Sequence, residues 1–212
     1  MVNDEKIIDD SQFTIHKKTE MMTSATTNEP KRIHPHKFTM WVAMGSIVMA
    51  FAGLTSAYIV KKNQSSWLEF DLPIVFWYST VVILVSSLTM HLATKAFKAR
   101  EMGRYRTLMT VTAGLGVLFI VLQYLGFNDL EARGIALIGP KSNSAASFLF
   151  VITGLHMVHV LGGVIALLVM FIRAYSSKVK SYSAIPVEVA GTYWHFVDIL
   201  WIYLLIFYNW IG

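Results

Sequence analysis

The chain has 212 residues, of which 55% are hydrophobic and only 15% are charged. A soluble domain carries roughly 25% charged residues, so this composition excludes an ordinary soluble protein and indicates a membrane protein. Cysteine is absent, which excludes a disulfide framework, a thiolate metal site and a thiol nucleophile. The net charge of +5 comes from short basic clusters beside apolar runs, where positive charge fixes membrane orientation, so nucleic acid is excluded as a partner.

The first part of the chain differs in character from the rest. Residues 1–37 are polar and rich in Asp, Lys, Thr and Ser. They could not bury enough apolar surface to offset the entropy cost of ordering, so we interpret them as a polar cytoplasmic segment. No repeat or low-complexity linker divides residues 38–212, which we interpret as one membrane domain.

Five apolar runs in this domain are long enough to cross about 30 Å of hydrocarbon at about 1.5 Å per residue. They span residues 38–60, 72–97, 107–126, 145–172 and 186–210. The runs lack period-2 alternation and are too long for barrel strands. The predicted fold class is therefore all-α, an integral membrane bundle of five transmembrane helices. We expect the longest connection, residues 127–144, to lie across the membrane surface.

The basic residues are divided unequally between the two sides of this bundle. One side holds Lys and Arg from the N-terminal segment, from residues 95–106 and from residues 173–180. The other side carries only Lys61, Lys62, Arg133 and Lys141. Because cytoplasmic loops are enriched in Lys and Arg, we expect the N-terminus inside and, after an odd number of spans, the C-terminus outside.

Small residues form a stripe on the first predicted helix. They recur at steps of four, three and four, at Ser46, Ala50, Gly53 and Ala57. Notches of the same kind occur at Gly114 and at Gly162–Gly163. Membrane helices approach closely at small residues, so the stripe predicts a helix interface, either within this bundle or with another subunit.

Ionisable residues at membrane depth gather in the last two predicted helices. Glu188, His195 and Asp198 are spaced to share one face of the last helix, and His156 and His159 share a face of the helix before it. Each such group costs a few kcal/mol unless it has a partner or a task. At about 1.5 Å per residue, His159 and Asp198 come to similar depths, so we predict that they pair.

Three interpretations of this cluster remain open. A haem site would need His pairs that face each other across the bundle, and two His one turn apart on one helix cannot serve as opposite axial ligands. A proton or ion pathway would use Glu188 at the inner end and the imidazoles beyond it. The third is a satisfied polar interface with bound lipid. The intramembrane histidines are His91, His156, His159 and His195. Gly-rich phosphate loops, HExxH and GxSxG motifs are absent from the sequence.

The last two helices resemble a known family. Residues 191–212, GTYWHFVDILWIYLLIFYNWIG, resemble the terminal helix of subunit III of haem-copper cytochrome c and quinol oxidases, whose hallmark YWHFVD includes Trp194. Residues 153–163, TGLHMVHVLGG, are similar to the family's GFHGLHVIIG, with both histidines retained. His91 and Gln123 also fall where the family has comparable residues. The resemblance covers residues 38–212 and is loose in the first three helices.

The resemblance implies a short, five-helix subunit III that carries no haem or copper of its own. Haem and copper are then expected in partner subunits, with subunit I in direct contact, and subunit II and other respiratory-complex subunits nearby. The family binds phospholipid and helps sustain proton uptake, in a complex of the bacterial inner membrane that reduces oxygen to water with proton translocation. The residues expected to serve structure, lipid or proton uptake are His91, Gln123, His156, His159, Glu188, Trp194, His195 and Asp198.

The sequence also leaves alternatives and one departure from the family. Ile47 stands where many members carry a Glu in the first of these helices, so no role of that carboxylate transfers to this chain. A related subunit of a quinol oxidase or of a nitric oxide reductase would have the same features, because the donor and acceptor sites lie in other subunits. A stand-alone transporter would use Glu188 and the His cluster.

Overall fold

The computed structural model describes residues 16–18, 35–62, 67, 72–139, 143–175 and 185–211. The chain divides into two compact units, residues 1–38 and 39–212. In the first unit the described residues are an exposed helical turn at 16–18 and the beginning of helix α2. We interpreted residues 1–37 as a cytoplasmic segment, and the other residues of that segment lie outside the described residues.

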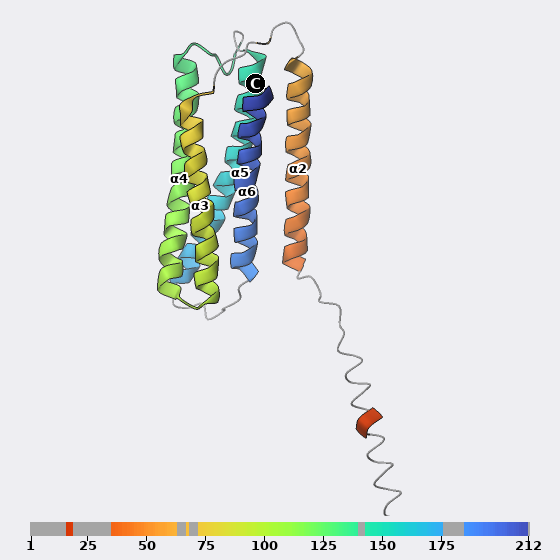
Figure 1. Ribbon diagram of the computed structural model, residues 1–212, viewed down its shortest axis with the longest axis vertical. Coiled ribbons are helices and arrows are strands. Elements are labelled where there is room, and N and C mark those ends of the chain that lie inside the picture. Colours follow the sequence, from red (N-terminus) through yellow and green to blue (C-terminus); the bar gives the residue numbers. More distant parts are fainter. Residues whose placement is uncertain are drawn as a thin grey trace, which may run out of the picture. The chain divides into compact units, whose positions relative to one another are not determined.

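Five long helices make up nearly all of the described chain (Figure 1). They are α2 (Pro35–Lys62), α3 (Ile74–Lys98), α4 (Met102–Ala132), α5 (Ser144–Tyr175) and α6 (Ile185–Ile211). Each is long and apolar enough to cross a membrane, and the described ranges contain no strand. This confirms the predicted all-α fold with five transmembrane helices.

Helix α4 is longer at both ends than the predicted span 107–126. At its C-terminal end Phe127 and Leu130 are buried in the core, and Arg133 forms an ion pair of 2.6 Å with Asp129, four residues earlier. Such a pair supports the last turn of a helix. The expectation that residue 127 begins a surface connection was therefore wrong: the connection starts after Ala132.

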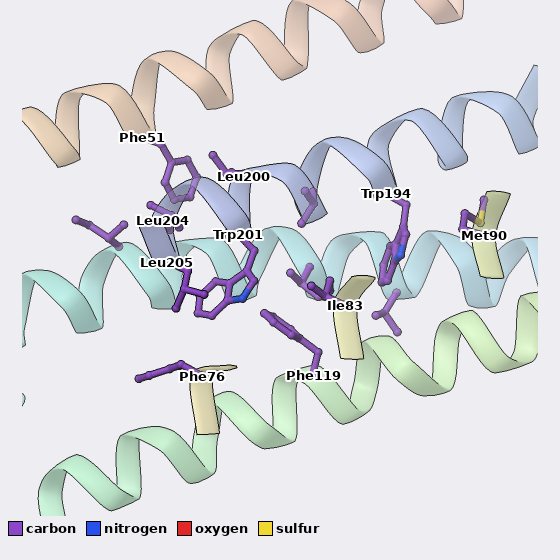
Figure 2. Packing of buried hydrophobic residues seen from close by; sticks show 14 of the residues in the cluster. Phe51, Phe76, Ile83, Met90, Phe119, Trp194, Leu200, Trp201, Leu204 and Leu205 are labelled. Carbon is purple, nitrogen blue, oxygen red and sulfur yellow. The ribbon is translucent and has the colours of Figure 1, made fainter. Parts of the chain in front are cut away.

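Helices α3, α4, α5 and α6 pack closely around an aromatic core. Backbone contacts join α3 to α4 and α6, and join α5 to α4 and α6. Trp201 of α6 lies inside this group, with its ring centroid 6.0 Å from that of Phe76 and 5.2 Å from that of Phe119 (Figure 2). Its indole Nε1 donates a hydrogen bond of 2.9 Å to Thr80 Oγ1. The large ring thus fills the space between the helices while its polar atom is satisfied.

Helix α2 is attached to the other helices by long side chains alone. No Cα of α2 lies within 8 Å of a Cα in another described helix. Its contacts include the Phe51 ring against His159, a 3.1 Å hydrogen bond between Thr55 Oγ1 and Tyr203 Oη, and Tyr58, whose ring centroid lies 5.2 Å from that of Phe207. Lys62 also donates a hydrogen bond to the carbonyl oxygen of Ile211. The face of α2 that carries these large side chains is therefore the face that packs against the other helices of the chain.

The predicted stripe of small residues lies on a different face of α2. Ser46, Ala50 and Gly53 are exposed, and a Cβ added at Gly53 would meet nothing within 4 Å. Packing of this stripe within the chain, one of the two alternatives, is thus not observed, because the aromatic face of α2 turns the small residues outward. The notch at Gly163 does pack internally, whereas Gly114 and Gly162 are exposed.

Candidate functional site

Polar residues follow one face of α3 and meet a polar face of α6. On α3 they recur at steps of four, three and four residues, which places them on one side of a helix. We call the following set the polar seam: Ser87, His91, Thr94 and Lys98 of α3 with Glu188, Gly191, His195 and Asp198 of α6. The two helices are antiparallel, so residues earlier in α3 lie beside residues later in α6 (Figure 1).

The seam begins with an ion pair where α3 ends and α6 begins. Lys98 Nζ lies 2.9 Å from Glu188 Oε1, and the two side chains are 56% and 29% exposed. One step further, Gly191 faces Thr94 so closely that an added Cβ would lie 3.3 Å from Thr94 Oγ1. The glycine therefore permits α3 and α6 to approach each other at this point.

Two imidazoles occupy the middle of the seam. The ring centroids of His91 and His195 are 6.4 Å apart, and the planes of the rings are inclined by 50°. Nδ1 of His195 shares a hydrogen bond of 2.6 Å with Ser87 Oγ. His195 is therefore held by α3, while His91 is exposed on the outer side of the seam.

Asp198 closes the seam inside the protein. Its side chain lies next to Ser87 and the residue is only 1% exposed. Neither carboxyl oxygen has hydrogen-bond geometry to any described residue. Beyond Asp198 the fully buried Trp201 of α6 meets α3, where its indole donates the hydrogen bond to Thr80.

The two histidines of α5 form a separate group. His156 is fully buried; its ring stacks on that of Trp201 at 5.4 Å and meets Phe119 and Phe51 edge-on at 5.9 and 6.4 Å. Neither ring nitrogen of His156 has a hydrogen-bond partner among the described residues. Nδ1 of His159 lies 2.7 Å from the carbonyl oxygen of Leu155, one turn earlier in the same helix.

The predicted pair between His159 and Asp198 was wrong. His159 engages its own helix backbone, and Asp198 lies beside Ser87 of α3. Two side chains must lie at similar depths in the membrane to form a pair. Depth alone does not determine which neighbouring helix each side chain contacts. Here the acidic face of α6 meets α3.

Gln123 and Trp194 are both buried and hydrogen-bonded to serines of α3. Gln123 Nε2 donates a bond of 2.8 Å to Ser79 Oγ, and Trp194 Nε1 donates one of 3.0 Å to Ser86 Oγ. The indole of Trp194 also fits against Gly163, where an added Cβ would lie 3.0 Å from the ring. These contacts show that Gln123 and Trp194 hold helices together.

Apart from His91, sequence reasoning missed the α3 side of the site. Ser79, Ser86 and Ser87 were not singled out, although each receives or shares a hydrogen bond with a residue that was. A signal was present in the spacing of Ser87, His91, Thr94 and Lys98. Polar residues that recur on one face of an apolar helix indicate that the face meets polar groups of a neighbour.

The polar seam presents hydrogen-bonding groups in succession along two helices. Within the described ranges, no group of three or more His, Asp or Glu is placed to hold one metal ion. The seam instead joins a partly exposed ion pair to a buried carboxyl through imidazole and hydroxyl groups.

These features define a multi-pass helical membrane protein with an internal polar seam, and comparisons with known proteins identify its family. The family model for cytochrome c oxidase subunit III matches residues 65–212. Cytochrome c oxidase subunit 3 of Corynebacterium diphtheriae is 31% identical over 202 residues, which cover 87% of this chain and 97% of the relative. The subunit 3 of Bacillus sp. is 28% identical over 169 residues, covering 77% of this chain and 80% of the relative. The chain belongs to the cytochrome c oxidase subunit III family, and as such it is part of a multi-subunit oxidase complex.

Proposed function

We propose that this chain is a non-redox accessory subunit of a haem-copper terminal oxidase in a bacterial inner membrane. Its N-terminus faces the cytoplasm, it packs directly on subunit I, and subunit II and other respiratory subunits are further partners. Haem and copper reside in the partner subunits, so the reduction of oxygen belongs to the complex. This chain binds phospholipid, supports proton uptake and stabilises the enzyme.

The observation that carries this proposal is the environment of the intramembrane imidazoles. His195 Nδ1 is bonded to Ser87, and His159 Nδ1 is close to a backbone carbonyl of its own helix. His156 is enclosed by the rings of Phe51, Phe119 and Trp201. An axial haem ligand needs open space in front of a free ring nitrogen, and the aromatic rings packed around His156 occupy that space, so this packing favours a structural role for His156 over haem ligation.

The outward face of α2 supports contact with a partner subunit. Its small residues Ser46, Ala50 and Gly53 are exposed, beside large exposed side chains such as Met49 at 77%. In a bilayer, such a face is covered by lipid or by a closely packed helix, and small residues favour the helix. Phospholipid is then expected to cover the remaining apolar surface, such as that around Val158 and Ile199.

The polar seam supports a link to proton uptake. Glu188 and Lys98 stand at the ends of their helices, on the side that the distribution of basic residues assigns to the cytoplasm. A carboxylate at that position can attract and deliver protons near the surface. The family match favours the oxidase over a stand-alone transporter that would use the same residues.

Deletion of this chain tests the accessory role. We expect the oxidase without it to begin oxygen reduction at nearly the normal rate and to lose activity sooner during turnover. The measurement is oxygen consumption over time by the purified complex, with haem content as the control for assembly. Immediate and complete loss of activity in a remainder that retains its haem would contradict the proposal.

A further inference from the structure

The polar seam is open at one end and closed at the other. At its open end the side chains of Lys98 and Glu188 are 56% and 29% exposed. At its closed end Asp198 is 1% exposed, and the next contact between the two helices is made by the buried Trp201, whose indole is bonded to Thr80. Polar and ionisable groups thus extend from an accessible end of the helix pair to a carboxyl deep inside it.

Within the described residues no cation is paired with the buried carboxyl, which lies beside the hydroxyl of Ser87. Neither oxygen of Asp198 is hydrogen-bonded to a described residue, and the lysine of the seam, Lys98, is paired with Glu188 at the other end. An unpaired carboxylate in an apolar interior is so costly that such groups take up a proton instead. The hydroxyl of Ser87, beside this carboxyl, is able to pass a proton.

We propose that Asp198 holds a proton that exchanges with cytoplasmic water through Ser87, His195 and His91. The orientation rests on the proposed function, which places the open end of the seam on the cytoplasmic side. Ser87 Oγ and His195 Nδ1 are already 2.6 Å apart, and the ring of His91 is the next along the seam and is exposed. In this proposal the seam is a proton-holding site of the oxidase, and the Lys98–Glu188 pair is its accessible end.

The exchange balances as a series of proton transfers. Asp198 gives its proton to the Ser87 oxygen while the Ser87 hydroxyl proton passes to Nδ1 of His195. The proton on Nε2 of His195 then leaves toward His91 and water. The net change is one proton moved from Asp198 to water and a change of tautomer at His195, and the reverse steps reload the carboxyl.

The distance along the seam is compatible with this route. His91 lies about 10 Å from the Lys98 end, at about 1.5 Å per residue. Thr94 and Gly191 lie along that stretch, where the glycine contributes no side chain and the Thr94 hydroxyl faces it. From His91 the seam continues past Thr94 to the Lys98–Glu188 pair, whose partly exposed side chains give the relay access to water.

Infrared spectroscopy of the purified oxidase complex tests the proposal. The carboxylic C=O stretch shifts when the complex is transferred from H₂O to D₂O, and Asp198→Asn identifies the band. We expect the Asp198 band to be present and to exchange. Ser87→Ala should slow this exchange by about a hundredfold, the lower range of what a positioned proton-transfer group contributes. Ser87→Thr keeps a hydroxyl and should restore the exchange.

Ser86→Ala provides the matched control. Ser86 is the neighbouring serine, fully buried, and it contacts Trp194 and Thr112 instead of His195. Its replacement should leave the exchange rate of the Asp198 band unchanged, although it removes a buried hydrogen bond. Equal rates in Ser87→Ala and Ser86→Ala, or no band that Asp198→Asn removes, would overturn the proposal.

The haem content of each preparation distinguishes a failure of the proton-holding site from a failure of the proposed function. A complex that contains haem but shows no Asp198 band contradicts the proton-holding site and leaves the accessory role intact. A chain that purifies without any haem-containing partner contradicts the proposed function itself.

Discussion

Replacement of Trp194 with alanine is expected to lower the free energy of unfolding by about 3–5 kcal/mol, the usual cost of truncating a buried tryptophan. Trp194 is 1% exposed, packs against Gly116 and Gly163, and donates its indole hydrogen bond to Ser86. The variant therefore leaves a cavity and removes a bond from a buried hydroxyl. Thermal denaturation of the solubilised complex measures the effect.

Trp210→Ala is the control for this variant. Trp210 is 85% exposed at the end of α6, so its removal creates no internal cavity. We expect a change within about 0.5 kcal/mol, as is usual for surface positions. If the two tryptophans proved equally costly, or if Trp194→Ala were neutral, the packing described for α6 would be incorrect.

Replacement of Gly116 with alanine is expected to cost about 1–3 kcal/mol, because it overfills a packed interior. The new Cβ would lie 2.6 Å from Trp194 Cη2 and 2.8 Å from Val164 Cγ2, which are closer than real Cβ contacts. Helix propensity alone would favour alanine by up to about 1 kcal/mol, so the sign of the change reports the contact. The measurement is again the unfolding of the solubilised complex.

Gly114 offers a matched control in the same helix. A Cβ at Gly114 would meet nothing within 4 Å, so Gly114→Ala should be neutral or slightly stabilising. The costs at Gly116 and Trp194 should also be non-additive, since Trp194→Ala removes the ring that the new methyl group meets. A cost of Gly116→Ala that persists in full in the Trp194→Ala background would argue against this contact.

Most of the fold was predictable because the bilayer imposes a simple rule on length. A run of about 20 apolar residues can satisfy its backbone in lipid only as a helix, so all five spans were found. The end of α4 was missed because Asp129, Glu131 and Arg133 resemble a polar connection in composition. In the structure Arg133 pairs with Asp129 and Leu130 is buried, which extends the helix.

The sequence predicted which site residues share a face of one helix, but not which other helix that face contacts. The spacing of Glu188, His195 and Asp198 correctly indicated one polar face of α6. The neighbour of that face was not predictable, because helical periodicity fixes directions around one axis and says nothing of which other helix lies there. His159 and Ser87 both lie at a depth in the membrane where they could contact this face of α6. Because α6 packs against α3, the residue that contacts it is Ser87.

The stripe of small residues on α2 shows the same limit. Its spacing correctly indicated one face, and the choice between an internal and an external neighbour depended on the opposite side of the helix. Phe51, Thr55 and Tyr58 occupy the side that faces the bundle, so the small residues are left outside. The aromatic spacing, read together with the stripe, would have indicated this arrangement.

The most direct test of the accessory role is a measurement of haem in two preparations, the complex that copurifies with this chain and the chain expressed without its partners. We expect a haem spectrum and oxygen consumption in the first, and no stoichiometric haem in the second. A folded chain that binds haem or metal stoichiometrically on its own would contradict the accessory role.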